Sequence, residues 1–463
     1  MNGLKTPPRG LGILLLVGPS MVWAAEFIGS GEVILSTRMG AILGPTVLWA
    51  VVFGIFLKYW IGMSGARYTI CTGEGMIDMF SRMPGPKNWA VWVTLIAQFA
   101  AAAVSIGSLA AAAGVFVHSL LPVSPVLGGW LVTLFALAVV WSGVFDILKM
   151  VMSFFVLLIV FGVLYVAVKV SPGLSTLLKG LLFHVPAVPE WALSLPGVNA
   201  NPWREILPVL GWAAGGFASQ VWYTYWVIGA EYGMTAGRGY GRPADVDALK
   251  NMSKADADKV AGWCRVVYAD ATLAMLIGVV TTSGFLLAGA GVLRPNQLAP
   301  EGPSTAMTLA TIFSSRWGEF GAVLFLIAGC AALISTQIGQ LAGWPRLLAD
   351  ALRICVPAFN RRFVWKQQFR LFLSFFFLSN MILVYSFGFK PVLIVKLSAV
   401  LDGLLLTPLQ ALWLLIGLYL VQPRLLSAQA ARQLKPHWIF AVGLVFALIV
   451  YGYFCIFQIP QIF

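Results

Sequence analysis

The sequence predicts an all-α polytopic membrane protein, and its composition, its long apolar segments and its charge distribution support this class. The chain has 463 residues, of which 60% are hydrophobic and only 10% are charged, and its mean hydropathy is +0.88. A soluble protein is typically about 25% charged, so this chain has too few polar side chains to cover its own surface. Lipid must therefore be the solvent for much of the chain, and the bilayer is its first expected partner.

Long uninterrupted apolar runs predict helices rather than strands. Runs such as 126–140 and 154–168 do not alternate in polarity, as membrane strands do. In lipid, each backbone polar group must find a partner inside its own segment, which such runs achieve only as helices. Since one crossing takes about 20 residues, hydropathy predicts 11 transmembrane helices. They span 10–37, 42–65, 89–119, 126–142, 149–170, 204–232, 262–292, 318–347, 369–389, 391–421 and 437–459.

The net charge of +13 follows from where lysine and arginine are placed. If the N-terminus is cytoplasmic, most of these residues fall in cytoplasmic loops, with the largest groups in 238–259 and 346–370. The positive-inside rule therefore predicts an inner-membrane protein with its N-terminus in the cytoplasm and its C-terminus outside. This distribution needs no nucleic acid partner. No nucleotide-binding GxxxxGK[ST] motif and no HExxH metal motif is present, so we expect neither a nucleotide, nor a cofactor, nor an enzyme.

The order of the segments predicts two similar halves. Residues 1–170 form a first five-helix repeat, and 171–203 form an extracellular linker rich in proline and leucine. Residues 204–421 are expected to form a second five-helix repeat, and 422–463 to add a C-terminal transmembrane helix.

A glycine cluster interrupts the first helix. Gly29 and Gly31 flank Ser30, and Glu26 and Glu32 stand on either side. Glycine costs up to about 1 kcal/mol per helical position relative to alanine, so the helix should unwind here. Unwound backbone at bilayer depth is tolerated where it lines a cavity, and intramembrane carboxylates are usually functional. We therefore expect a binding site here, although the glycines could instead serve only close helix packing.

The sixth helix, the first of the second half, carries a matching cluster in 211–220. Paired interruptions at corresponding positions indicate the midplane substrate site of an inverted-repeat carrier. Gly215, Ala218, Ser219 and Gln220 are the candidate substrate-binding residues of this segment. Without a nucleotide-binding motif, an ion or solute gradient would drive such a carrier.

Four stretches resemble the Nramp metal-transporter family. They are Gly-Pro-Ser at 18–20, Arg-Met-Gly-Ala at 38–41, Ala-Arg-Tyr-Thr-Ile-Cys-Thr-Gly at 66–73, and much of 322–343. The resemblance covers most of the chain in spacing and helix order. It implies a LeuT-like fold, in which helices one to five and six to ten are inverted repeats and helices one and six are interrupted.

The metal-binding residues of that family are replaced here. Its Asp-Pro-Gly-Asn break aligns with 29–32, so the aspartate is absent and Glu32 takes the asparagine position. Its metal-binding methionine falls on about Ala218, and the acidic residues linked to proton transfer fall on Ser105 and Ser108. The resemblance therefore implies a divergent member whose proton path has been altered.

The candidate ligands that remain are oxygen atoms. Glu32 is the expected central metal ligand, supported by Glu26, Ser30, Ser219 and Gln220. Because no thioether is present, this set favours a hard divalent cation, Mg²⁺ or Mn²⁺, moved by alternating access.

A small organic solute is the alternative cargo. The N-terminal ends of broken helices can hold a carboxylate, and aromatic residues surround the sixth-helix break. An amino acid, an organic cation or a small carboxylate would suit such a cavity. A non-transporting sensor is the third class. The coupling ion, the direction of transport and the oligomeric state are not predicted by these residues.

Several ionisable residues in the spans are candidates for coupling or for a polar relay. Lys58 could extend to the cytoplasmic interface. It could instead face inward, where a pair with Glu26 or Glu32 would remove the need for a coupling cation. Asp402 and Asp270 could relay protons or belong to buried pairs. Ser105 and Ser108 complete this candidate set.

Overall fold

The computed structural model describes residues 4–10, 12–13, 18–170, 172–195, 197–300, 305–387 and 391–461. All regular secondary structure in these residues is helical, as predicted. Eight of the described helices are long and apolar enough to cross a membrane. Each predicted span overlaps a helix, whereas the count of 11 crossings stays a prediction.

The first half opens with an interrupted helix and ends with α7. Its elements are α1 (Pro19–Phe27), the π-helix η2 (Gly31–Ser36), α2 (Thr37–Leu43), η3 (Pro45–Val47), α3 (Leu48–Thr72), α4 (Met76–Ser81), α5 (Trp89–Leu120), α6 (Pro125–Val140) and α7 (Phe145–Val170). The short helices α8 (Leu174–Gly180) and α9 (Glu190–Leu193) follow it.

The second half opens with another interrupted helix. Its elements are α10 (Trp203–Trp212), α11 (Phe217–Gly229), η4 (Gly233–Thr235), α12 (Val246–Lys250), α13 (Lys254–Ala288), η5 (Gly289–Leu293), η6 (Arg294–Asn296), α14 (Thr305–Cys355), α15 (Pro357–Arg362), α16 (Trp365–Phe387), α17 (Pro391–Val400), the π-helix η8 (Leu401–Leu405), α18 (Thr407–Ile416) and η9 (Gly417–Val421). The chain then forms α19 (Gln422–Leu425), α20 (Ala428–Gln433), α21 (Trp438–Tyr453), η10 (Phe454–Gln458) and η11 (Ile459–Gln461).

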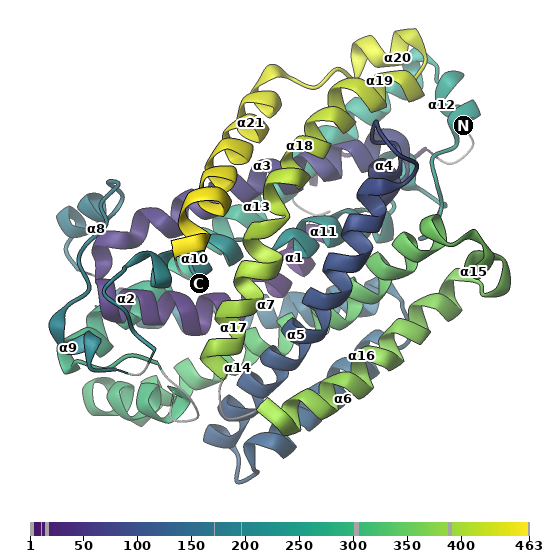
Figure 1. Ribbon diagram of the computed structural model, residues 1–463. Helices are drawn as coiled ribbons and strands as arrows, with labels where there is room; N and C mark the ends of the chain where they lie inside the picture. Colours follow the sequence, from purple (N-terminus) through teal and green to yellow (C-terminus); the bar gives the residue numbers. More distant parts are fainter. Residues whose placement is uncertain are drawn as a thin grey trace.

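The long helices form one bundle, with the two interrupted helices near its middle (Figure 1). Helices α5, α6 and α16 pack side by side on one flank (Figure 1). The short helices α8 and α9 lie at one end, here called the linker end. Helices α12, α15 and α20 lie at the opposite end with the N-terminus, here called the N-terminal end.

The outer helices expose large apolar side chains, as a protein dissolved in lipid must. On α7, Phe154, Phe161 and Val168 are exposed, and on α21 Trp438 and Ile449 are exposed. Soluble proteins rarely expose such contiguous apolar surface. The predicted multi-pass membrane class is thus confirmed by the fold.

Both predicted interruptions are present. The first lies between α1 and η2, at residues 28–30. The second lies between α10 and α11, where Ala214 has φ 55° and Gly215 has φ 79°. These left-handed conformations are favourable only for glycine and a few polar residues, so Ala214 is held in a strained turn. The glycine content of each cluster therefore predicted the breaks correctly.

Candidate functional site

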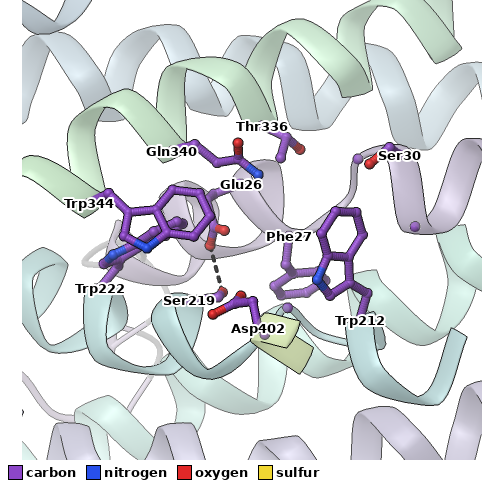
Figure 2. A pocket seen from close by; sticks show the side chains of 14 residues that line it. Glu26, Phe27, Ser30, Trp212, Ser219, Trp222, Thr336, Gln340, Trp344 and Asp402 are labelled. Carbon is purple, nitrogen blue, oxygen red and sulfur yellow. Dashed lines mark hydrogen bonds between the residues drawn. The ribbon is translucent and has the colours of Figure 1, made fainter. Parts of the chain in front are cut away.

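The two interruptions meet at a small cavity in the middle of the bundle (Figure 2). Its volume is about 20 Å³, which accommodates about one water molecule or one ion. Its walls come from α1, η2, α10, α11, α14, η8 and the two breaks. The lining residues are Glu26, Phe27, Gly29, Ser30, Gly31, Trp212, Gly215, Gly216, Ser219, Trp222, Thr336, Gln340, Trp344 and Asp402.

Glu26 brings a carboxylate from the last turn of α1. It is 3% exposed, and its Oε2 accepts a hydrogen bond of 2.7 Å from the hydroxyl of Ser219 (Figure 2). The Ser219 Oγ in turn accepts a bond of 3.1 Å from Nε1 of Trp23. A carboxylate has about four lone-pair positions, so one hydroxyl leaves most of its acceptor capacity available.

Asp402 brings a second carboxylate, from the π-helix η8. Its Oδ1 accepts hydrogen bonds from Gln98 Nε2 at 3.0 Å and from the backbone N–H of Ala218 at 3.2 Å. The amide oxygen of Gln98 accepts a bond of 2.9 Å from the Trp344 indole, which fixes the orientation of the amide. Gly216 gives Asp402 its room, because a Cβ there would lie 1.8 Å from Oδ2.

Three polar atoms on the cavity wall have no hydrogen-bond partner among the residues that the structure describes. They are Ser30 Oγ, Gln340 Oε1 and Trp222 Nε1. Leaving a buried polar group unsatisfied costs about 1–3 kcal/mol, so such groups indicate a place for a ligand. Two of the three are oxygens. Within the described residues, no group of three or more His, Cys, Asp and Glu could hold a metal ion, so neutral oxygens would have to complete any metal site.

The structure brings half of the predicted site residues together at the cavity. Those that line the cavity are Glu26, Gly29, Ser30, Gly31, Gly215, Ser219 and Asp402. The prediction of a shared site at the two breaks therefore fits the geometry, although binding itself is untested.

Three predicted residues instead hold the breaks in shape. The Glu32 Oε2 accepts a bond of 2.9 Å from the N–H of Gly29, so its carboxylate folds back onto its own backbone. The Gln220 amide donates to the carbonyl of Ala214 at 2.6 Å. Ala218 contributes its N–H to Asp402. Glu32 does not line the cavity, so its role as the central ligand stays a prediction that this geometry does not favour.

Lys58 does not reach the cytoplasmic interface, and that interpretation is wrong. The side chain is fully buried, and its ammonium donates to carbonyl groups at the second break. Its donors go to these and other neutral oxygens, and within the described residues it forms no ion pair with Glu26 or Glu32. Hydrogen bonds to the unpaired carbonyls at the break are more favourable for the ammonium than extending the side chain to water.

The remaining relay candidates surround the cavity without lining it. The Ser105 hydroxyl accepts a bond of 3.1 Å from Gln340, and Ser108 donates to the Ser105 carbonyl at 2.9 Å. Asp270 lies at the start of α1, where its Oδ1 accepts from the N–H of Gly18 at 3.3 Å and its Oδ2 accepts from Tyr223 at 2.8 Å. Asp270 therefore caps α1 rather than contacting the cavity.

Sequence reasoning missed the wall formed by α14. Thr336, Gln340 and Trp344 are spaced four residues apart, which places them on one helix face. All three line the cavity (Figure 2). Polar residues at this spacing in an apolar span were the available signal.

Buried ion pairs connect the helices on the linker side of the cavity. Arg38 Nε donates to Glu205 Oε2 at 3.0 Å, and Lys396 Nζ donates to Glu205 Oε1 at 2.8 Å. Arg38 also donates to the carbonyl of Pro300 at 2.8 Å. This linker-end cluster joins α2, α10 and α17 around one carboxylate.

A second set of ion pairs lies toward the N-terminal end. Arg353 Nη2 donates to both oxygens of Asp78, at 2.8 and 2.9 Å, and its Nε donates to Asp350 at 3.2 Å. Arg82 donates twice to Glu74, at 2.8 Å each, and this hydrogen bonding raises the pKa of Arg82. This N-terminal-end cluster joins α4 to α14.

Comparison with known proteins gives the family that the chain resembles. Residues 20–198 match the sequence model of the natural resistance-associated macrophage protein-like family, Nramp. The divalent metal cation transporter MntH of Yersinia enterocolitica is 33% identical over 112 residues, which are 22% of this chain and 27% of that protein. The MntH of Chromohalobacter salexigens is 28% identical over 191 residues, 40% of this chain and 43% of its own length. The matches thus span between about a quarter and under half of these relatives.

The fold matches over nearly the whole chain. A crystal structure of the Eremococcus coleocola manganese transporter, in complex with an aromatic bis-isothiourea compound, aligns with a TM-score of 0.62 and 16% identity. It covers 99% of this chain and 92% of that protein. At this identity the likeness establishes the fold alone. The chain therefore has the LeuT-like fold and resembles the Nramp family, in sequence over residues 20–198 and in architecture throughout.

Proposed function

We propose that the chain is a secondary carrier for a divalent metal cation, with Mn²⁺ favoured over Mg²⁺. One observation supports this most directly: two carboxylates and two unpartnered oxygens converge on a cavity of about 20 Å³. Carboxylate, hydroxyl and amide oxygens are ligands that hard divalent cations prefer. The metal would be the cargo, and the matched relatives are named divalent metal cation transporters.

Glu26 is the proposed central ligand. Asp402 is close enough to Lys58 to interact with it electrostatically, so a cation already balances part of its charge. The Glu26 carboxylate accepts its hydrogen bond from a neutral hydroxyl, that of Ser219. A divalent cation would therefore gain most from Glu26, with Ser30 and Gln340 supplying neutral oxygens.

The size of the cavity supports Mn²⁺ over Mg²⁺. Mg²⁺ loses its water reluctantly and usually keeps several water molecules when it binds to protein. A space for about one water cannot hold an ion with such a shell. Mn²⁺ accepts the same oxygen ligands, so it suits the closed cavity better.

We further propose how the carrier lies in the membrane and moves. The chain would lie in the inner membrane with its linker end outside and its N-terminal end in the cytoplasm, since the basic loops gather at the latter. Residues 1–170 and 204–421 would act as inverted repeats, joined by the linker 171–203 and followed by 422–463. Relative motion of the repeats would expose the cavity to one side at a time.

Calorimetric titration of the purified full-length protein with Mn²⁺ and Mg²⁺ tests the cargo and its ligand together. Glu26→Gln removes the proposed ligand. Glu32→Gln is the matched control, because glutamine can still accept the N–H of Gly29. We expect saturable Mn²⁺ binding to the wild type and to Glu32→Gln, and at least about tenfold weaker binding to Glu26→Gln.

Each other result has a defined meaning. Loss of binding in Glu32→Gln alone would return the ligand role to Glu32. Stronger binding of Mg²⁺ than of Mn²⁺ would reverse the proposed selectivity. If the folded wild type gives no binding heat with either metal, the metal proposal is overturned. Binding without uptake of Mn²⁺ into proteoliposomes would indicate a sensor instead of a carrier.

A small organic solute remains a second candidate, because four aromatic residues, Phe27 and three tryptophans, line the cavity. The tryptophans are Trp212, Trp222 and Trp344, and the Trp222 indole N–H has no acceptor within the described part of the chain. A carboxylate or carbonyl oxygen of a solute would satisfy that donor. Saturable heat with amino acids, small carboxylates or organic cations, in the absence of a response to metals, would favour this candidate.

A further inference from the structure

The ammonium of Lys58 lies inside a cage of uncharged oxygens. It lies 3.1 Å from the carbonyl oxygens of Gly211 and Gly215, 2.9 Å from that of Gly403 and 3.3 Å from the hydroxyl of Thr407. An ammonium has only three N–H donors, whereas four oxygens lie at these distances. The oxygens therefore surround the charge as they would surround a spherical cation. The side chain has no exposed surface.

The cage exists because both helices that form it are irregular. In a continuous helix the N–H of Gly215 would bond to the carbonyl of Gly211, but it bonds instead to Trp212 at 2.7 Å. The carbonyl of Gly403 lies in the π-helix Leu401–Leu405, which departs from the ordinary hydrogen-bond ladder. Freed carbonyls are costly at bilayer depth unless a partner satisfies them.

Such oxygens are the usual ligands of monovalent cations within membranes. Carbonyl groups of unwound helices and hydroxyl side chains coordinate Na⁺ or K⁺ in channels and carriers. The surroundings of Lys58 suit a positive charge in two further ways. Its Nζ lies 5.2 Å from the centre of the Tyr451 ring, and it interacts electrostatically with Asp402.

We propose that Lys58 is a built-in cation that fills a monovalent-cation site formed by the second break and η8. The site adjoins the cargo cavity and shares Gly215 with it, whereas Lys58, Gly211, Gly403 and Thr407 do not line that cavity. It holds the break closed without a bound ion from solution. Stability and cargo binding should therefore not depend on Na⁺ or K⁺, and removal of the side chain should open the site to small cations.

This proposal does not depend on the identity of the cargo. Asp402 links the two sites, because it lines the cavity and adjoins Gly403 in the cage. Loss of the ammonium would leave Asp402 without its cation, and an uncompensated buried charge is strongly destabilising. Any cation that enters the empty cage would restore this balance.

Chemical rescue tests the proposal on the full-length protein in detergent. We would measure the midpoint of thermal unfolding for the wild type and Lys58→Ala in choline chloride, NaCl, KCl and n-propylammonium chloride. Choline is too large for the vacated space. We expect no difference between these salts for the wild type. Lys58→Ala should unfold at a lower temperature in choline, and a saturable fraction of the loss should return with Na⁺ or propylammonium.

Two control variants locate the effect. Lys58→Met fills the vacated space without a charge, so no salt should rescue it. Lys396→Ala removes another lysine, but one that faces a carboxylate already bonded to Arg38, so its unfolding midpoint should not respond to the choice of cation. Equal rescue of Lys58→Met or Lys396→Ala would show that the response does not arise in the cage, and would overturn the proposal.

Further outcomes would also overturn it. One is a Lys58→Ala protein that is as stable as the wild type in choline. Another is a Lys58→Ala protein that cannot be recovered in any of these cations while Lys58→Gln folds. The third concerns the intact cage: saturable stabilisation of the wild type by Na⁺, lost in Thr407→Ala, would mean that an external ion already occupies the site.

Discussion

At the residue scale, the cavity depends on one contact between a glycine and a carboxylate. A methyl group at Gly216 would lie 1.8 Å from Oδ2 of Asp402, which is far inside van der Waals contact. Gly216→Ala should therefore displace Asp402 from the cavity wall. We expect a loss of about 1–3 kcal/mol in the free energy of unfolding, and weaker Mn²⁺ binding in calorimetric titration.

Gly452→Ala is the matched control for this substitution. Gly452 has no heavy atom near the position of an added Cβ and has an ordinary helical conformation in α21. Alanine there should leave stability unchanged or raise it by a few tenths of a kcal/mol. If Gly216→Ala binds Mn²⁺ with wild-type affinity, Asp402 does not act from the position that the structure gives it.

At the element scale, α1 is a short helix whose start is held by a side chain from α13. Asp270 accepts hydrogen bonds from the N–H of Gly18 and from Tyr223. A carboxylate at this end also complements the helix dipole. Asp270→Ala should cost about 1–3 kcal/mol and accelerate amide hydrogen exchange in Pro19–Phe27. The exposed Asp247 provides the control, and equal exchange in both variants would mean that α1 is held by packing alone.

The elements themselves could be predicted from the sequence, but the orientations at the breaks could not. Glycine clusters and apolar length placed the helices and both interruptions, because these depend on local conformational cost and on lipid. Once a helix unwinds, the 100° step per residue no longer fixes where a side chain points. The sequence therefore did not reveal that Glu26 faces the cavity while Glu32 bonds to Gly29.

Long-range partners were also out of reach. Lys58 reaches the carbonyl of Gly403, 345 positions away in the sequence. Such a contact depends on how α3 packs against the two irregular helices, and neither hydropathy nor spacing encodes that packing directly. The carbonyl cage is neither the cytoplasmic interface nor the carboxylate pair that the sequence suggested for Lys58.

At the scale of the whole molecule, the cavity lies between two sets of buried ion pairs. The linker-end cluster centres on Glu205, and the N-terminal-end cluster centres on Arg353. Removing one partner of a buried ion pair lowers the free energy of unfolding by about 3–5 kcal/mol, because the other charge stays buried without compensation. Substitution on one side should therefore bias the molecule toward opening on that side, as the proposed alternating access requires.

Accessibility of a cysteine in the cavity measures this bias. Ser30→Cys places a thiol on the cavity wall. A membrane-impermeant methanethiosulfonate is then applied to one face of oriented proteoliposomes. The wild-type protein, which carries only the native cysteines, gives the background labelling. In the Ser30→Cys protein, labelling should be slow from both faces, because the cavity is closed.

In this background, Glu205→Gln should accelerate labelling from the linker face, since a neutral amide cannot hold both Arg38 and Lys396. Arg353→Ala should accelerate labelling from the opposite face, since it releases Asp78 and Asp350. Acceleration from both faces in either variant would indicate local unfolding, and acceleration from the wrong face would mean that the clusters do not act as gates.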